Sequence, residues 1–260
     1  MLYICIPVYN EAPTIGVLLW RIRKVFQEYA REYEIIVFDD GSTDSTADVL
    51  QPYTEVLPLT LLGGKAHVGY AGALEALCRE VSRRTRYPRR DAMVTLQGDF
   101  TDQPEHLPEL IKRFEGGADL VVAERPAKGE RGDRGEPPKP VRWMRRVAPW
   151  VVRPFAGVPG VNDPFGTFRL YRISLVRDLI KQSGDQPLVQ GTVWAANVDL
   201  LHRTAPFARR IETVALEPRY DLRPRESRVH PWAEALDLFR SGRTRRRRGS
   251  AERPPAKNTS

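Results

Sequence analysis

The chain has 260 residues, 41% of them hydrophobic, and a formal net charge of +8. This is enough to bury a core in one α/β domain, which we expect over residues 1–240, with a basic tail over 241–260. Two cysteines, Cys5 and Cys78, exclude a disulfide scaffold and a cysteine-rich zinc site and indicate a reducing compartment. The apolar runs fall short of the ~20 residues that span a bilayer, and strand-like residues follow Met1 directly. We therefore expect a cytoplasmic protein, free or peripheral on the inner face of the membrane.

The positive charge is confined to two segments. Residues 240–260 carry seven Arg and one Lys against one Glu, and residues 125–153 carry seven Arg and two Lys against three acidic residues. These segments contribute +7 and +6, which leaves −5 on the rest of the chain. Localised basicity favours contacts with anionic surfaces at particular places, such as a membrane, and argues against specific nucleic-acid binding.

Strand-like and helix-like patterns alternate through the first half of the chain. Apolar residues from Ile15 to Tyr29 recur at helical spacing, with Pro13 in the first turn, and a second helix ends at Leu50. Ser42 or Thr43 is the expected N-cap of that second helix. Further helices are predicted over 68–84 and 104–114, and strands over 3–8, 34–38, 56–62, 92–96 and 119–123. This alternation predicts a mostly parallel sheet with helices on both faces.

The second half begins with a Gly, Pro and charge-rich segment, 126–140, which we interpret as a mobile loop. In the next segment, 141–158, four arginines fall on one side and Trp143 and Trp150 on the other at ~100° per residue. This pattern is typical of an interfacial helix on an anionic membrane, and an ordinary helix packed on the sheet is the alternative. Strands follow over 167–171 and 211–216, and helices over 174–182, 188–202 and 231–240.

An acidic turn follows the fourth predicted strand. It contains Gln97, Gly98, Asp99, Thr101 and Asp102. Hard cations prefer oxygen ligands, so a carboxylate beside glycine at this position suits a divalent cation held against a phosphate. A simple turn that ends the strand is the alternative interpretation.

Other polar residues also follow predicted strand ends. They are Asn10, Glu11, Asp39, Asp40, Lys65 and Arg125. Ligands of open α/β sheets bind outside the carboxyl ends of the strands, so we expect these residues to converge with Asp99 on one edge.

Three motifs at strand ends together resemble the family 2 glycosyltransferases. They are Ile6-Pro7-Val8-Tyr9-Asn10-Glu11, Phe38-Asp39-Asp40-Gly41-Ser42-Thr43-Asp44 and Gln97-Gly98-Asp99. Members of this family are inverting enzymes that use nucleotide sugars. The resemblance implies a single domain of GT-A (Rossmann-like) fold, a nucleoside diphosphate sugar as donor, and Mg²⁺ or Mn²⁺ held by Asp99 and Thr101.

The same resemblance implies a set of donor-binding residues. Tyr9 would face the base, and Asp40 is our preferred nucleoside contact. For Asp39 and Asp44, helix capping is the alternative, and for Lys65 an ordinary surface lysine. The complete donor set comprises Pro7, Tyr9, Glu11, Asp39, Asp40, Lys65, Gln97, Gly98 and Arg125.

A narrower resemblance, over most of the chain through Arg228, is to the dolichol-phosphate (polyprenol-phosphate) mannosyltransferase branch. The residues that carry it are Gly64-Lys65, Val68-Gly69-Tyr70-Ala71, Asp99 with Thr101, Pro104-Glu105, Arg125, Asp163 to Leu170, Arg223, and Ser227-Arg228. It implies a polyprenyl phosphate acceptor and places the 141–158 segment on the membrane surface. The acceptor phosphate would bind Arg223, Arg225, Ser227 and Arg228, with catalytic roles for Asp99, Asp163 and Arg169.

The arginines assigned to catalysis and to the acceptor have structural alternatives: an ion pair for Arg169 and a solvated loop for Arg223, Arg225 and Arg228. Two positions depart from the family pattern. Gln97 stands where relatives have the first aspartate of an Asp-x-Asp pair, and Thr167 stands where they have glycine. Glutamine offers an oxygen but no charge.

Three rival functions remain open. A hydroxyl acceptor would need a base, for which Asp163 is the candidate. A nucleotide-sugar-binding protein with weakened catalysis is suggested by Gln97. A sugar nucleotidyltransferase shares the sheet architecture, but it needs a glycine-rich loop after the first strand, and residues 7–11 contain no glycine.

Overall fold

The computed structural model of the protein describes residues 1–124, 157–216, 234 and 237. The predicted loop 126–140, almost all of the 141–158 segment and the tail 241–260 lie outside the described residues. Of the closing helix predicted over 231–240, only Glu234 and Asp237 are described. Their carboxylates accept hydrogen bonds from Thr192 and Trp194, at the start of the helix Val193–Thr204.

The described strands form one seven-stranded sheet in the order β3-β2-β1-β4-β6-β5-β7. Among them only β6 is antiparallel, lying between β4 and β5, so the expected mostly parallel sheet is confirmed. The strands are β1 (Leu2–Val8), β2 (Tyr33–Asp40), β3 (Leu59–Gly64), β4 (Ala92–Thr95), β5 (Leu120–Glu124), β6 (Arg169–Arg172) and β7 (Ile211–Ala215).

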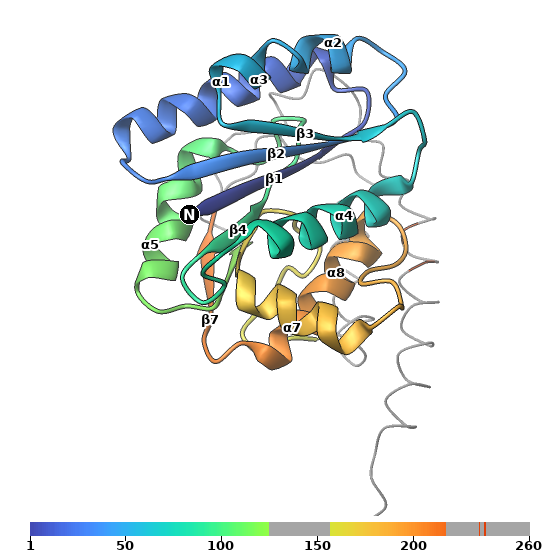
Figure 1. Ribbon diagram of the computed structural model, residues 1–260. Coiled ribbons are helices and arrows are strands. Elements are labelled where there is room, and N and C mark those ends of the chain that lie inside the picture. The colour runs from blue at the N-terminus through green and yellow to red at the C-terminus, as the bar shows by residue number, and fades with distance from the viewer. Residues whose placement is uncertain (125–156, 217–233, 235–236, 238–260) are drawn as a thin grey trace, which may run out of the picture.

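Helices cover both faces of this sheet (Figure 1), as the alternating pattern predicted. One layer contains α1 (Ala12–Glu28), α2 (Thr46–Leu50), α3 (Tyr53–Val56), the short η1 (Pro104–His106) and α5 (Leu107–Glu115). The other contains α4 (Gly69–Arg84), α7 (Ile173–Ser183) and α8 (Val193–Thr204), which leads into η2 (Ala205–Phe207).

The central strand β1 shows why two helical layers are needed. Its side chains alternate between the faces of the sheet, with Ile4 and Ile6 in one apolar cluster and Tyr3 and Cys5 in the other. A parallel strand that is apolar on both sides must be covered on both sides, since neither face can be left in water.

Three predicted boundaries are wrong. The third strand begins at Leu59 rather than at residue 56, because α3 occupies Tyr53–Val56 and Leu57 is extended before Pro58. Neither Ser42 nor Thr43 caps α2, which begins at Thr46; their hydroxyls instead accept hydrogen bonds from Asn10.

The third wrong boundary is at α8, which begins at Val193 rather than at residue 188. Gly191 has a φ of +96°, a left-handed conformation that a right-handed helix cannot contain. The strands predicted over 3–8, 34–38, 92–96, 119–123, 167–171 and 211–216 are confirmed to within two residues at each end.

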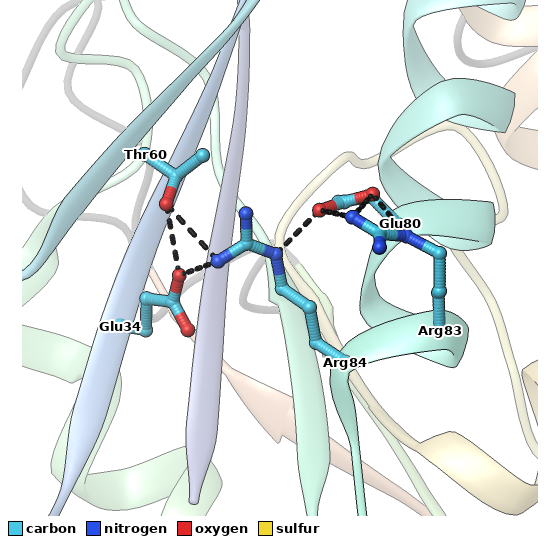
Figure 2. Close-up of polar contacts among 5 residues, drawn as sticks. All are labelled: Glu34, Thr60, Glu80, Arg83 and Arg84. Atoms are coloured by element: carbon cyan, nitrogen blue, oxygen red, sulfur yellow. Dashed lines mark hydrogen bonds and ion pairs between the residues drawn. The ribbon is translucent and has the colours of Figure 1, made fainter.

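A polar cluster ties the last turn of α4 to the amino-terminal ends of β2 and β3 (Figure 2). One nitrogen of Arg84, Nη1, donates to Glu34 and, over 3.1 Å, to Thr60, while its Nε donates to Glu80. The neighbouring Arg83 contacts only Glu80 within this cluster, and its side chain is 74% exposed against 29% for Arg84. Arg84 therefore links α4 to both β2 and β3, whereas Arg83 contacts only a residue of its own helix.

We predict that Arg84→Ala lowers the free energy of unfolding by about 1–2 kcal/mol, because it leaves the half-buried Glu34 carboxylate without its charged partner. Arg83→Ala is the matched control, and it should leave stability unchanged, since its exposed ion pair contributes little. Urea unfolding followed by circular dichroism measures both. Equal losses of stability in the two variants would contradict this account of the cluster.

Candidate functional site

The predicted convergence of polar residues is confirmed for those that the structure describes. Strands β1 to β4 are mutually parallel, so their carboxyl ends lie on the same edge of the sheet. Asn10 and Glu11 follow β1, Asp40 ends β2, and Lys65 follows β3 directly with its side chain exposed. We call this edge, together with the turn 97–102 that follows β4, the rim.

Asn10 attaches the loop after β2 to the end of β1. Its backbone has a φ of +51°, a left-handed conformation that asparagine tolerates better than most residues. Its N–H donates to the hydroxyl of Ser42 over 2.8 Å, and its side-chain oxygen accepts the N–H of Thr43 over 2.6 Å. The loop that carries Asp39 to Asp44 is thereby held in one position at the rim.

The three aspartates of this loop have different partners. Asp39 accepts the N–H of Ser42 over 3.0 Å and closes a turn, so it does not cap a helix. Asp44 is not the N-cap residue of either helix, but it accepts the N–H groups of Thr46 and Ala12, the first residues of α2 and α1, so its carboxylate joins the two helix starts. Burial of Asp44 opposes ionisation, but its hydrogen bonds outweigh that effect and lower its pKa.

Asp40 is buried, with 4% of its surface exposed, and lies against the first turn of α4. One carboxylate oxygen accepts the N–H groups of Val68 and Gly69 over 2.6 and 3.2 Å, and the other lies 3.1 Å from Nδ1 of His67. The His67 ring in turn packs against Tyr9, with ring centroids 4.7 Å apart. An aromatic ring and an oriented carboxylate therefore lie side by side at the rim.

Three further predicted residues, Pro7, Glu11 and Gly98, lie at or just after the ends of β1 and β4. Pro7 removes no hydrogen bond between β1 and β4, because that pairing ends at Cys5. Glu11 is 6% exposed and accepts the hydroxyl of Thr14 over 3.0 Å. A Cβ atom at position 98 would lie 3.1 Å from Cγ1 of Val8, which is tighter than ordinary van der Waals contact, so glycine lets the turn after β4 pack against the end of β1.

The turn after β4 orients Asp99. One of its carboxylate oxygens accepts the N–H of Thr101 over 3.1 Å and the Thr101 hydroxyl over 2.7 Å. Phe100, between them, has a φ of +65°, which an aromatic residue rarely adopts. The carboxylate of Asp102 accepts the N–H of Gln97 over 3.1 Å and so closes the same turn.

The oxygen-rich chemistry of this turn fits a hard divalent cation. The residues that the structure describes contain no cluster of three or more His, Cys, Asp or Glu side chains able to hold a metal alone. The oxygen atoms that this turn could offer to such a cation are those of Asp99 and Thr101.

Arg169 lies in the interior rather than at the surface. None of its area is exposed, and its guanidinium donates to the carbonyl oxygens of Asn197, over 2.6 Å, and of Pro164. The ion pair considered for it does not occur among the described residues. Its contact with Pro164 supports the turn that carries Asp163, whose carboxylate accepts the N–H of Phe165 over 3.1 Å.

Two residues of the site were missed by the sequence interpretation. Glu124, 9% exposed, accepts hydrogen bonds from the backbone N–H and side-chain amide of Asn162 and, over 3.3 Å, from the N–H of Asp163. His67 was missed because it lacked metal-ligand spacing, although its place between a glycine pair and a helix was a usable signal. The other predicted residues, Arg125, Arg223, Arg225, Ser227 and Arg228, lie outside the described residues.

Known proteins have sequences similar to part of this chain. The undecaprenyl-phosphate 4-deoxy-4-formamido-L-arabinose transferase of Pseudomonas aeruginosa is 28% identical over 180 residues, which are 68% of this chain and 48% of that protein. The chain thus spans about half the length, or less, of the first curated relatives it matches.

Two solved structures share the fold. The mannosyl-3-phosphoglycerate synthase of Rubrobacter xylanophilus has a TM-score of 0.65 at 17% identity, covering 98% of this chain and 78% of its own. The glucosyl-3-phosphoglycerate synthase of Mycobacterium tuberculosis, solved with Mn²⁺, uridine diphosphate and phosphoglyceric acid, has a TM-score of 0.63 at 17% identity and covers 98% and 80%. The GT-A fold is therefore confirmed.

The model of one protein family, described as glycosyl transferase family 2, matches residues 3–180. This range contains the strand ends, the Asp39 to Asp44 loop and the Asp99 turn, that is, the rim as the structure describes it. The chain belongs to glycosyl transferase family 2.

Proposed function

We propose that this protein transfers a sugar from a nucleoside diphosphate sugar to a polyprenyl phosphate, with inversion at the anomeric carbon. The observation that carries the proposal is the meeting of Tyr9, Asp40 and the Asp99 turn on one edge of the sheet. An aromatic ring and a carboxylate suit a nucleoside, and an oxygen-rich turn suits its diphosphate.

On the donor side, Tyr9 faces the base and Asp40 accepts from a base N–H or a ribose hydroxyl. The presence of uridine diphosphate in the Mycobacterium tuberculosis neighbour supports uracil as the base. The Asp40 carboxylate is pre-oriented for this contact, because the backbone N–H groups of Val68 and Gly69 donate to it.

On the diphosphate side, Asp99 and Thr101 hold Mg²⁺ or Mn²⁺ against the phosphates, and Lys65 and Arg125 add positive charge. The Mn²⁺ in the Mycobacterium tuberculosis structure supports the binding of a divalent cation here. Such a cation stabilises the charge that develops on the departing diphosphate. The protein's own part is to orient the donor and to hold the leaving group in line with the acceptor.

On the acceptor side, a lipid phosphate is already an anion and needs no general base. The name of the Pseudomonas aeruginosa relative supports such an acceptor. Arg223, Arg225, Ser227 and Arg228 bind its phosphate, since arginine pairs with phosphate oxygens in bidentate fashion. Arg169 acts behind this site by supporting the Pro164 turn. If the acceptor is instead a hydroxyl group, Asp163 on that turn is the base.

The acceptor also implies a membrane surface. Within the described residues, no helix is both long and apolar enough to cross a bilayer. We propose that the 141–158 segment lies in the interface, with Trp143 and Trp150 inserted and its arginines on anionic headgroups. The run Arg245 to Arg248 adds attraction of about 1 kcal/mol per charge near such a surface.

The second prediction concerns Asp99→Asn. This change keeps the oxygen that accepts from Thr101 but removes the charge, so we expect folding to be retained and kcat to fall about 10²–10³-fold. Transfer from a panel of nucleotide sugars to undecaprenyl phosphate, with Mn²⁺ present, measures the loss. Glu28→Ala is the control, because Glu28 is an exposed carboxylate at the opposite end of α1 from the rim.

Circular dichroism should show the same secondary structure in both variants. Transfer at the wild-type rate by Asp99→Asn would remove Asp99 from the reaction and overturn the proposed mechanism. Transfer to hydroxyl acceptors but not to the lipid phosphate would favour the alternative with Asp163 as base.

The third prediction concerns membrane attachment. Replacing Trp143 and Trp150 together by serine should remove most of the protein from the floating fraction when it is mixed with anionic phosphatidylglycerol vesicles, because both apolar anchors are lost. Trp20→Ser is the matched control, since Trp20 is a 55% exposed tryptophan on α1. Unchanged flotation of the double variant would show that the segment does not hold the protein on the bilayer.

A further inference from the structure

A buried asparagine on α8, Asn197, joins the start of α4 to the turn 162–165, which carries Asp163. The two helices lie in the same layer, on one face of the sheet (Figure 1). Only 3% of Asn197 is exposed. Its side-chain oxygen accepts the hydroxyl of Tyr70, on α4, over 2.9 Å, and its side-chain nitrogen donates to the carbonyl oxygen of Phe165 over 3.3 Å. The two ends of one amide group therefore hold two parts of the chain that are far apart in sequence.

The direction of each hydrogen bond follows from what each group can offer. A carbonyl oxygen can only accept, so the nitrogen of the Asn197 amide faces Phe165 and its oxygen faces Tyr70. Burial of the hydroxyl raises the pKa of Tyr70, so this hydroxyl keeps its proton and donates to Asn197. A rotated amide would set its own oxygen against the oxygen of Phe165. The Tyr70 hydroxyl therefore stabilises the amide orientation that holds the turn.

Thr167, which follows the turn, takes part in the same network. Its hydroxyl accepts the side-chain N–H groups of Asn197 over 3.2 Å and of Gln97 over 2.7 Å. It also hydrogen-bonds to Tyr70, and it is the donor there because the Tyr70 proton is used on Asn197. With two bonds accepted and one donated, this hydroxyl has no capacity left. Buried polar groups whose bonds are all used favour a single arrangement of the side chains around them.

The start of α4 also holds Asp40, the residue proposed to contact the nucleoside. The backbone N–H groups of Val68 and Gly69 donate to its carboxylate over 2.6 and 3.2 Å, and Tyr70 is the next residue. One helical turn thus sets the positions of both Asp40 and Tyr70. The hydrogen bonds of Tyr70 and Asn197 connect this donor side of the rim to the turn 162–165.

A second contact keeps the turn attached to α8 without involving α4. Arg169, which is fully buried, donates to the backbone carbonyl of Asn197 over 2.6 Å and to that of Pro164. Arg169 therefore ties the turn to α8 and to its own strand β6, whereas the Tyr70 bond ties it to α4. Loss of the Tyr70 hydroxyl should leave the turn attached but able to shift relative to the donor side.

We infer that Tyr70 and Asn197 are positioning residues for the transfer, which set the turn 162–165 in a fixed place relative to Asp40. This inference rests on the proposed function, in which the nucleoside lies at Asp40 and the acceptor beside Asp163. Both residues act through the backbone of the turn. Direct displacement requires the acceptor and the anomeric carbon to be held in line, and a misplacement of about 1 Å can slow such a step about 10²-fold.

Tyr70→Phe tests the inference by removing a single oxygen atom. The ring is kept and Tyr70 is only partly buried, so the variant should fold. Asn197 loses the donor to its oxygen, and its amide is then free to rotate away from Phe165. Tyr29→Phe is the matched control. Tyr29 is also partly buried, and its hydroxyl donates to Glu115 over 3.2 Å at the end of α1 opposite the rim.

Two measurements separate positioning from donor binding. Isothermal titration calorimetry gives the affinity for uridine diphosphate with Mn²⁺, and transfer to undecaprenyl phosphate is followed with the nucleotide sugar that the wild type uses best. In Tyr70→Phe we expect uridine diphosphate to bind within about twofold of wild type and kcat/KM for undecaprenyl phosphate to fall about tenfold. Tyr29→Phe should match wild type in both measurements.

Three results would overturn the inference. They are wild-type transfer by Tyr70→Phe, a loss of uridine diphosphate binding equal to the loss of transfer, and an equal loss of transfer in Tyr29→Phe. The first would show that the hydroxyl has no positioning role, the second that it acts on donor binding, and the third that removing any such hydroxyl slows the enzyme.

Asn197→Leu shows whether Tyr70 acts through Asn197. Leucine has a similar shape but no polar atoms, so this variant should lose at least as much transfer as Tyr70→Phe. Adding Tyr70→Phe to it should cause less than about twofold further loss, since the amide that Tyr70 orients is already absent. A further loss of about tenfold would contradict action through Asn197. Should Asn197→Leu not fold, the comparison of Tyr70→Phe with Tyr29→Phe still decides the inference.

The wild-type protein separates this inference from the function on which it rests. If wild type transfers sugar to undecaprenyl phosphate and Tyr70→Phe does so equally well, only the positioning role is overturned. If wild type transfers only to a hydroxyl acceptor, the lipid acceptor is wrong, and the same comparison of variants on that hydroxyl acceptor decides the inference. If wild type neither binds uridine diphosphate nor transfers from any nucleotide sugar, the proposed function fails and the inference fails with it.

Discussion

Parallel pairing of β1 with β2 on one side and β4 on the other is the constraint on which the rest of this structure depends. The register sets Val8 beside Asp39 and Cys5 beside Thr95. Because parallel strands end on the same edge, the three strand-end motifs, which are far apart in sequence, lie next to one another at the rim. The apolar side chains of β1, buried on both faces, prevent a shift of this register, since a one-residue slip would exchange the two faces.

The groups proposed to bind the donor are held by the fold before any ligand arrives. Asp40 accepts from two amides of α4, and Asp99 accepts from Thr101. Asn10 fixes the loop that follows Asp40 through the hydroxyl of Ser42. Each bond lowers the freedom that ligand binding would otherwise have to remove, so the rim is largely pre-organised. The same bonds also stabilise the fold, which means that changes at these residues affect stability together with binding.

The turn 162–165, which we propose lies on the acceptor side, is held by buried charged side chains. Glu124 holds the backbone at Asn162 and Asp163, and Arg169 holds the carbonyl of Pro164. Both are charged side chains with less than a tenth of their surface exposed, and the buried Nε of Arg169 has no hydrogen-bond partner among the described residues, so burying these groups costs stability.

The sequence by itself determined the alternation of strands and helices, the mostly parallel sheet and the family, because periodicity and strand-end motifs are local patterns. It also identified the Asp99 turn. Only the tertiary structure decided that β6 runs antiparallel between β4 and β5, that Arg169 is buried, and that Thr167 contacts Gln97. These facts depend on contacts between residues that are tens of positions apart, and no local pattern reports which distant backbone will supply a partner. The helix that Ser42 and Thr43 were expected to cap shows the same limit, since Asn10 uses their hydroxyls instead.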